Sequence, residues 1–288
     1  MSRALIFGRT GQVARELARR VPDGVTAVFL DREAADLCDP AACATAVAAH
    51  RPDLVINAAA YTAVDRAEDE EPLASVINGD APGAIAQAAQ ALDVPFLHVS
   101  TDYVFDGGGR DPWRPDAPAA PLGAYGRSKL AGEIAVRQSG TSSILRVSWV
   151  FSAHGSNFVK TMLRLAETRA ELHVVADQTG GPTAAADIAS TLWSMGRALQ
   201  SGAARPGVYH FAGRPDASWA EFAREIFARA GRQVKVIDIP TKDYPTPARR
   251  PMNSRFDCAM LETEFGLTRP DWRQSLAAVL AELAEAGP

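Results

Sequence analysis

The chain has 288 residues, 47% of them hydrophobic, and a formal net charge of -4. This length is enough for a well-buried core in either one large α/β domain or two unequal lobes. The negative charge and the lack of a basic block argue against nucleic acid as a partner. No apolar run approaches the ~20 residues of a membrane span, which excludes a membrane partner as well.

The cysteines and the first residues bear on the compartment. Cys38, Cys43 and Cys258 form neither a CxxC pair nor an even set, which favours packing residues in a reducing compartment. The first predicted strand begins near Arg3 and leaves no room for a signal peptide. We therefore expect a cytoplasmic protein with a small-molecule ligand.

Short apolar runs alternate with longer helical stretches in the first half of the chain. Strands are predicted at 4–7, 26–30, 54–57 and 96–100, and helices at 13–20, 40–50 and 72–92. This alternation is typical of an α/β fold with a doubly wound parallel sheet of Rossmann type and helices on both faces. Ligands of such sheets bind beyond the carboxyl ends of the strands, so the polar motifs should gather there.

The second half of the chain has a more mixed pattern. Residues 143–151 are predicted to add a core strand. Further strands are predicted at 172–176, 208–211 and 234–239, and helices at 157–169, 185–199, 218–230 and 271–286. The sequence thus predicts a Rossmann domain over 1–150 and a smaller, mainly substrate-binding lobe over 151–288. Part of this second half, about 172–200, is predicted to return to the Rossmann sheet.

Gly8 and Gly11 follow the first predicted strand and open the first helix. Glycines at this place let a pyrophosphate approach the backbone and the helix N-terminus. Asp31, at the end of the second strand, is suited to binding an adenosine ribose and favours NAD. Arg9 and Arg32 are suited to binding a 2′-phosphate and favour NADP, so the two signals conflict.

Asp36 and Leu37 come shortly after the second strand, where a pair of residues can contact adenine. A helix cap is the alternative explanation for this acidic residue.

Tyr125 and Lys129 stand four positions apart on a predicted helix and therefore lie on one face of it. A phenol titrates near ~10, so a tyrosine that exchanges a proton at neutral pH needs a cation that stabilises its phenolate. Lys129 is placed to be that cation. Thr101, at the end of the fourth strand, could hydrogen-bond a substrate carbonyl and the phenol together. These three residues are the predicted catalytic group.

Three features point to the substrate. Arg249 and Arg250 lie in the proline-framed segment 244–251, which suits a diphosphate; a solvated loop is the alternative. Trp149 follows a predicted strand and could stack on a sugar ring, or could be a core residue. The Gly- and Pro-rich loop 106–123 precedes the helix of Tyr125 and has the character of a substrate-side excursion.

Five blocks of the sequence, 7–13, 57–65, 100–105, 125–133 and 245–251, resemble those of the extended short-chain dehydrogenase/reductases, and more closely those of the dTDP-4-dehydrorhamnose reductases. The resemblance runs nearly end to end. Its last block is the most specific, because the epimerases and dehydratases of the superfamily lack it. The resemblance implies reduction of dTDP-4-dehydro-L-rhamnose to dTDP-L-rhamnose, the last step of dTDP-rhamnose biosynthesis. The implied cofactor is NADPH, with NADH as the alternative.

The resemblance also implies roles for single residues. Tyr125 and Lys129 would be the catalytic pair, and Thr101 would take the place of the superfamily's usual serine. The sugar nucleotide would contact Thr101, Asp102 and Trp149. The cofactor would be lined by residues near the ends of the first three strands: Gly11, Gln12, Val13, Asp31, Asp36, Leu37, Ala60 and Thr62.

Some members of this family form a dimer that holds Mg²⁺ at its interface through carboxylates. This chain has Glu16, but Ala186 stands where such a member can carry glutamate, with Asp187 next to it. The sequence therefore predicts no bound metal, and it leaves open whether the protein is a monomer or a homodimer.

Two alternatives come from other functional classes. A sugar-nucleotide epimerase or dehydratase would keep NAD bound through turnover, so net consumption of NAD(P)H would distinguish a reductase from it. A non-catalytic relative, the regulatory subunit of methionine adenosyltransferase, keeps the Rossmann fold and a Tyr-x-x-x-Lys pattern. The segment 246–251 argues against this second alternative, because that relative diverges there.

Overall fold

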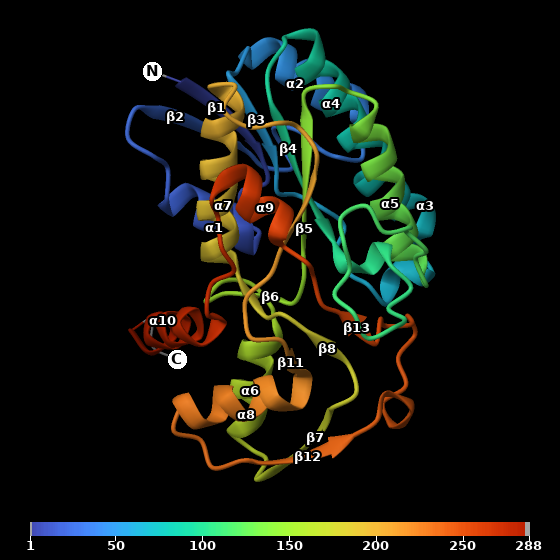
Figure 1. Cartoon of the computed structure of the whole chain (residues 1–288), viewed down its shortest axis with the longest axis vertical. Coiled ribbons are helices and arrows are strands. Elements are labelled where there is room, and N and C mark those ends of the chain that lie inside the picture. Colours follow the sequence, from blue (N-terminus) through green and yellow to red (C-terminus); the bar gives the residue numbers. More distant parts are fainter. Residues whose placement is uncertain (1, 286–288) are drawn as a thin grey trace.

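The computed structural model describes residues 2–285, which form an α/β unit with a smaller lobe at one end (Figure 1). The α/β unit is built on six parallel strands in the order β10-β5-β4-β3-β1-β2. These strands are β1 (Ser2–Phe7), β2 (Val25–Leu30), β3 (Leu54–Asn57), β4 (Phe96–Thr101), β5 (Ser142–Val147) and β10 (Val208–Phe211). The predicted doubly wound parallel sheet is confirmed.

The winding of the sheet reverses between β1 and β3. β2 pairs with one side of β1 and β3 with the other, so the connections before and after this point run to opposite edges. In open α/β sheets the ligand crevice lies at such a point, beyond the carboxyl ends of the strands. The fold therefore places the crevice beside the turns that follow β1 and β3.

Helices cover both faces of the sheet, as Figure 1 shows. Alternate residues of β1 point to opposite sides: Ala4 and Ile6 join one apolar cluster, and Leu5 and Phe7 join the other. This is the pattern of a strand buried on both faces. The first cluster includes residues of α1 (Gln12–Arg19) and α7 (Ala185–Gln200), and the second includes residues of α2 (Pro40–His50), α4 (Ala81–Ala91) and α5 (Ala124–Arg137).

The long helix predicted at 72–92 is wrong in one respect, because a π-turn divides it. α3 (Glu71–Ser75) passes into the π-helical turn η2 (Val76–Asp80) before α4 begins. Pro82 has no N–H to give to the carbonyl of Asn78, four residues earlier, and so the α-helical pattern cannot continue there. The freed carbonyl lies against Gly132 of α5, where a Cβ would approach it within 2.0 Å. The π-turn thus lets α5 pack closely.

The single strand predicted at 143–151 is also wrong, because the chain leaves the sheet after Val147. β6 (Val150–Phe151) pairs with β9 (Thr183–Ala184) in a separate two-stranded sheet. Between the two strands Trp149 has a φ of 49°, in the left-handed region. This bend carries the chain from the end of β5 into the smaller lobe.

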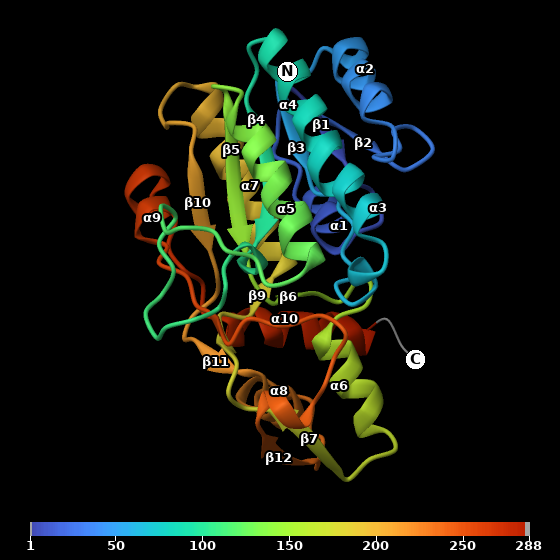
Figure 2. The same ribbon diagram turned by 90° about the vertical axis from the view of Figure 1, so that its right-hand side faces the viewer.

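The smaller lobe lies beyond the carboxyl ends of the main strands (Figure 2). Its apolar core is formed mainly by α6 (Phe158–Ala166), β7 (Glu171–Val175), α8 (Trp219–Arg229) and α10 (Trp272–Glu285). β7 pairs with β12 (Lys235–Ile239). A small sheet of β11 (Ala217–Ser218), β8 (Thr179–Gly180) and β13 (Asn253–Ser254) lies between this lobe and the main sheet.

Of the range 172–200 that was predicted to return to the main sheet, the part that forms α7 packs on it, but the start of the range does not. β7, at the start of that range, pairs with β12 in the lobe, whereas β10 lies beyond its end and forms the edge of the main sheet. The reason is apolar burial, since Tyr209 and Phe211 of β10 join the same cluster as α7. The sequence did not predict α9 (Ala259–Phe265), and Ala286 of the last predicted helix lies outside the described residues. Within 2–285, no helix is both long and apolar enough to cross a membrane.

Candidate active site

The turn after β1 forms an open cradle at the N-terminus of α1. Gly8 has a φ of 108°, and a Cβ there would come within 3.3 Å of the Ala59 nitrogen, so this position requires glycine. Gly11 is the N-cap of α1, has no side-chain cap, and a Cβ built on it would meet nothing within 4 Å. The first N–H groups of α1 therefore face open space, an arrangement that fits the pyrophosphate of a dinucleotide.

The acidic and basic residues after β2 are paired with one another. Arg9 Nη1 lies 3.1 Å from Asp31 Oδ2, and Arg32 Nε lies 3.1 Å from Asp36 Oδ2. Hydrogen bonding from the Ala34 amide and the Arg9 guanidinium hold the pKa of Asp31 below its ordinary value. Both guanidinium groups are exposed, so the rim of the crevice offers two cations and two carboxylates.

Several predicted cofactor residues have side chains that are engaged within the fold. Leu37 is buried in the core beneath α2, and Val13, a residue of α1, is buried in the cluster between α1 and the sheet. The Gln12 side chain accepts hydrogen bonds from Ser152 Oγ (2.9 Å) and Asn157 Nδ2 (3.0 Å), joining α1 to the N-cap of α6. Leu37 and Val13 therefore offer a cofactor mainly their backbone groups, whereas half-buried Gln12 is engaged through its oxygen and keeps its Nε2 group as a donor.

Ala60 and Thr62 lie in the turn that follows β3, across the crevice from the glycines. Asn78 fixes this turn, because its side chain accepts a hydrogen bond from the Tyr61 nitrogen (2.9 Å) and donates one to the Tyr61 oxygen (3.0 Å). Thr62 is exposed and Ala60 half-buried. The π-turn of η2 thus supports the edge of the predicted cofactor site.

Thr101, Asp102 and Tyr125 meet where β4 ends against the first turn of α5. Thr101 Oγ1 donates to Asp102 Oδ1 at 3.1 Å, and Ser254 Oγ of β13 donates to Asp102 Oδ2. Burial raises the pKa of Asp102 to about 6. Burial and the charge of Asp102 raise the pKa of Tyr125 above its ordinary value, and a hydrogen bond with Thr101 opposes this shift. Tyr125 is therefore a protonated phenol beside a threonine hydroxyl.

Lys129 is buried one helical turn after Tyr125, with its side chain directed at β4. Its Nζ donates to the Val99 oxygen at 2.8 Å and lies 3.2 Å from Nε2 of His98. Burial lowers the pKa of Lys129 to about 8, and the charge of Glu133 opposes this shift. The structure thus brings Thr101 and Tyr125 together at the junction of β4 and α5, and it places Lys129 one turn further along α5 with its amine on β4.

His98, which contacts Lys129, was not among the predicted site residues. This histidine is a buried polar residue in the otherwise apolar stretch at the start of β4, and that isolation was the signal that could have found it.

The predicted substrate residues lie on two sides of this junction. Trp149 stacks on Trp219 of α8 with ring centroids 3.6 Å apart, so one ring face is covered. Arg250 forms a bidentate ion pair with Asp65, with contacts of 2.9 and 3.1 Å. Arg249 is exposed, and its side chain has no ion pair with any residue in 2–285. Sequence reasoning missed Asp65 as the partner of Arg250.

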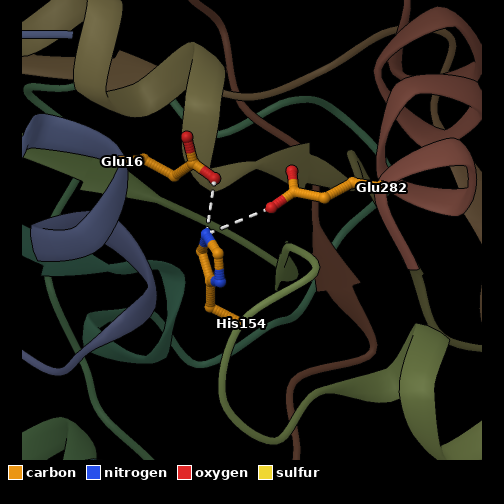
Figure 3. Close-up of side chains that lie close together, drawn as sticks. All are labelled: Glu16, His154 and Glu282. Carbon is orange, nitrogen blue, oxygen red and sulfur yellow. Dashed lines mark ion pairs between the residues drawn. The ribbon is translucent and has the colours of Figure 1, made fainter. Parts of the chain in front are cut away.

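A second cluster of ionisable groups lies between α1, α10 and the loop after β6 (Figure 3). His154 Nε2 lies 3.3 Å from Glu16 Oε1 and 3.6 Å from Glu282 Oε1. Arg19 pairs with both carboxylates, and Arg20 also pairs with Glu16. Mg²⁺ prefers six oxygen ligands in octahedral geometry. One imidazole and two guanidinium groups do not suit that ion, and the cluster is an ion-pair network that joins the lobe to the sheet unit.

Comparisons with known proteins agree on one family. Residues 2–285 match the family described as the RmlD substrate binding domain. The chain is 44% identical over 280 residues to a dTDP-4-dehydrorhamnose reductase of Sinorhizobium fredii, with 95% of each chain covered.

Two solved structures are similar over nearly the whole chain. The dTDP-4-dehydrorhamnose reductase of Clostridium acetobutylicum has a TM-score of 0.92 at 35% identity, and covers 98% of this chain and 99% of its own. That of Bacillus anthracis, in complex with NADP, has the same TM-score and coverage at 34% identity.

Proposed function

The chain belongs to the family of the RmlD substrate binding domain, and from this premise we propose that it is a dTDP-4-dehydrorhamnose reductase. It reduces dTDP-4-dehydro-L-rhamnose to dTDP-L-rhamnose with NADPH, the last step of dTDP-rhamnose biosynthesis. Relatives with this name match over 95% or more of their length, and one similar structure holds NADP. The single observation that carries the proposal is the half-buried Tyr125 beside buried Thr101, with buried Lys129 one turn along the same helix, in a chain matched over residues 2–285.

The proposed roles of the residues follow from this geometry. NADPH, when bound, supplies a hydride to the C4 carbonyl of the sugar. Tyr125 holds its proton at neutral pH and gives it to the oxygen that becomes negative. Thr101 orients that oxygen by a hydrogen bond, for which its single O–H, donated to Asp102 Oδ1 in this structure, turns toward the substrate. Lys129, in its charged form, stabilises the phenolate that remains.

The remaining parts of the chain hold the two ligands. The open N-terminus of α1 and the guanidinium groups of Arg9 and Arg32 would bind the pyrophosphate and the 2′-phosphate of NADPH. Arg249 and Arg250 would bind the diphosphate of the sugar nucleotide. The cytoplasmic location and the choice between monomer and homodimer stay predictions.

The test is oxidation of NADPH by the purified protein, followed by loss of its absorbance, with enzymatically made dTDP-4-dehydro-L-rhamnose. We expect oxidation only when the sugar nucleotide is present, and slower oxidation of NADH. No net oxidation, with sugar nucleotide converted, would instead support an epimerase or dehydratase. Normal dinucleotide binding without any conversion would support a non-catalytic binding protein.

A further inference from the structure

A chain of buried polar groups runs from the turn after β3 to the amine of Lys129. The Ala59 nitrogen donates to Asn57 Oδ1 at 3.1 Å, and Asn57 Nδ2 lies 3.2 Å from His98 Nδ1. His98 Nε2 in turn lies 3.2 Å from Lys129 Nζ. Asn57 and His98 are fully buried, and Lys129 is 2% exposed. Each member can therefore satisfy its hydrogen bonds only within the protein.

The charge state of His98 limits what it can do in this chain. Burial and the neighbouring Lys129 lower the pKa of His98 well below its ordinary value, so the imidazole is neutral. A neutral imidazole has one nitrogen that donates a hydrogen bond and one that accepts. The two neighbours of His98 must therefore differ in the role that they take.

Asn57 decides which nitrogen of His98 carries the proton. The Ala59 N–H occupies the Asn57 oxygen, which leaves the Nδ2 amide group, a donor only, facing His98 Nδ1. His98 Nδ1 must then accept, and the proton must lie on Nε2. The Nε2–H group points at Lys129 Nζ, which can accept it only as an uncharged amine, while Nζ donates to the Val99 oxygen.

We propose that His98 is a positioning residue for Lys129, which uses the tautomer imposed by Asn57 to donate a hydrogen bond to the uncharged amine and so favours that form. The proposal rests on the role of Lys129 in the proposed function. It means that Lys129, charged at neutral pH as the proposed function requires, loses its proton at a lower pH than it would without His98.

Other ionisable groups around α5 do not supply this effect. Glu133 lies one turn further along the helix, favours the charged form of Lys129, and is itself bound by Arg146 of β5. Asp102 and Tyr103 border the Tyr125 end of the helix. Other elements pack against α5 on the side away from the sheet. There Glu71 pairs with Arg127 of α5, and three charged groups are exposed to solvent: Arg66, Glu68 and Asp80.

The first test reads the tautomer of His98 without any turnover. In a long-range ¹H–¹⁵N NMR spectrum of ¹⁵N-histidine protein, the His98 signals, identified by their loss in His98→Gln, should show the proton on Nε2. A proton on Nδ1 would overturn the proposal. Asn57→Asp accepts from both Ala59 and His98, so it should move the proton to Nδ1. An unchanged tautomer in this variant would also overturn the proposal.

The second test is the pH dependence of kcat/KM for NADPH oxidation with the sugar nucleotide. Activity should fall as pH rises through the pKa of Lys129, near 8. His98→Leu removes the donor to the uncharged amine. The pH at which activity falls should therefore rise by about one unit, the shift expected from one ordinary hydrogen bond. The amide of His98→Gln offers a donor and an acceptor, so activity in this variant should fall at the same pH as in the wild type.

Ser100→Ala is the matched control, because Ser100 is also buried on β4 and its hydroxyl has no hydrogen-bond partner within the described residues. In this control, kcat/KM should fall at the same pH as in the wild type. If the pH of the fall is unchanged in His98→Leu as well, His98 has a packing role only. If His98→Leu does not fold, Asn57→Asp gives the decision: its His98 Nε2 would accept from the charged amine, so activity should fall at a higher pH than in the wild type, and an unchanged pH of fall would overturn the proposal. A wild type without turnover would refute the proposed function, and the NMR test of His98 would still stand.

Discussion

Asp65 and Arg250, 185 positions apart in the sequence, form a bidentate ion pair that joins the turn after β3 to the proline-framed segment 244–251. The Asp65 carboxylate also accepts a hydrogen bond from the Ala248 nitrogen at 3.2 Å. The hydrogen bond from Arg250 holds the pKa of Asp65 below its ordinary value. This pair fixes the segment that carries both predicted diphosphate-binding arginines.

We expect Arg249→Ala and Arg250→Ala to raise the KM for the sugar nucleotide more than they lower kcat. A diphosphate is bound alike in the ground and transition states, so its contacts act mainly on binding. The rise should be about 10- to 150-fold, as expected for a charge-assisted hydrogen bond of about 1.5 to 3 kcal/mol. Arg232→Ala, an exposed arginine of the lobe, is the control. An unchanged KM in both variants would show that neither arginine contacts the diphosphate.

The stability of Asp102→Asn relative to wild type should depend on pH. The folded-state pKa of Asp102 is raised to about 6, so the stability that its protonated form contributes is present at low pH and is lost as pH rises through about 6. The asparagine side chain does not ionise. The unfolding free energy of Asp102→Asn, relative to that of the wild type, should therefore increase between pH 4 and pH 8 by on the order of 3 kcal/mol. Urea unfolding of both proteins at pH 4 and pH 8 measures this difference in unfolding free energy. The same difference at both pH values would mean that burial does not raise the pKa of Asp102.

Gly126→Ala should damage both stability and activity. A Cβ at Gly126 would lie 2.2 Å from the Tyr103 oxygen, so the first turn of α5 would have to move away from β4 and carry Tyr125 away from Thr101. We expect a lower melting temperature and a fall in kcat in the folded fraction. Gly140→Ala is the control, because a Cβ there meets nothing within 4 Å and Gly140 does not have a positive φ. Equal behaviour of the two variants would show that the close packing of α5 is not needed.

The sequence predicted the sheet because its signals are local. The apolar runs of β1, β2, β3 and β4 and the glycines after β1 each carry their own pattern, and strands of a parallel sheet must end at one edge. The proximity of Thr101 and Tyr125 follows from that edge and the helix of Tyr125. A pattern of this kind needs no knowledge of distant contacts.

The features that the sequence did not predict depend on distant contacts. The ion pair of Arg250 with Asp65 and the stacking of Trp149 on Trp219 join segments that only the folded chain brings together. The bend at Trp149 occurs because β6 pairs with β9, 33 positions later in register. Likewise, β10 is assigned to the main sheet by its pairing with β5, which no local pattern in 208–211 indicates.

Lys129→Met should lose both rate and affinity for NADPH. Its ammonium is proposed to stabilise the Tyr125 phenolate, and the resemblance to the short-chain dehydrogenase/reductases implies that it also holds the nicotinamide ribose. The loss of the buried amine also leaves the Val99 oxygen and His98 Nε2 without their partner. Titration of NADPH fluorescence measures the affinity, and stopped-flow absorbance measures the rate. A variant with normal NADPH affinity would show that Lys129 does not contact the cofactor.

Tyr125 is proposed to give the proton, and Tyr125→Phe isolates this role, because the variant keeps the ring and removes only the hydroxyl. The decisive measurement is kcat at neutral pH with saturating NADPH and sugar nucleotide, in protein whose fold is checked by circular dichroism. We expect kcat to fall roughly 10²- to 10⁴-fold, the range for general acid catalysis, with almost unchanged affinity for NADPH. A kcat close to that of the wild type would contradict this role, because the oxygen would then receive its proton from another group.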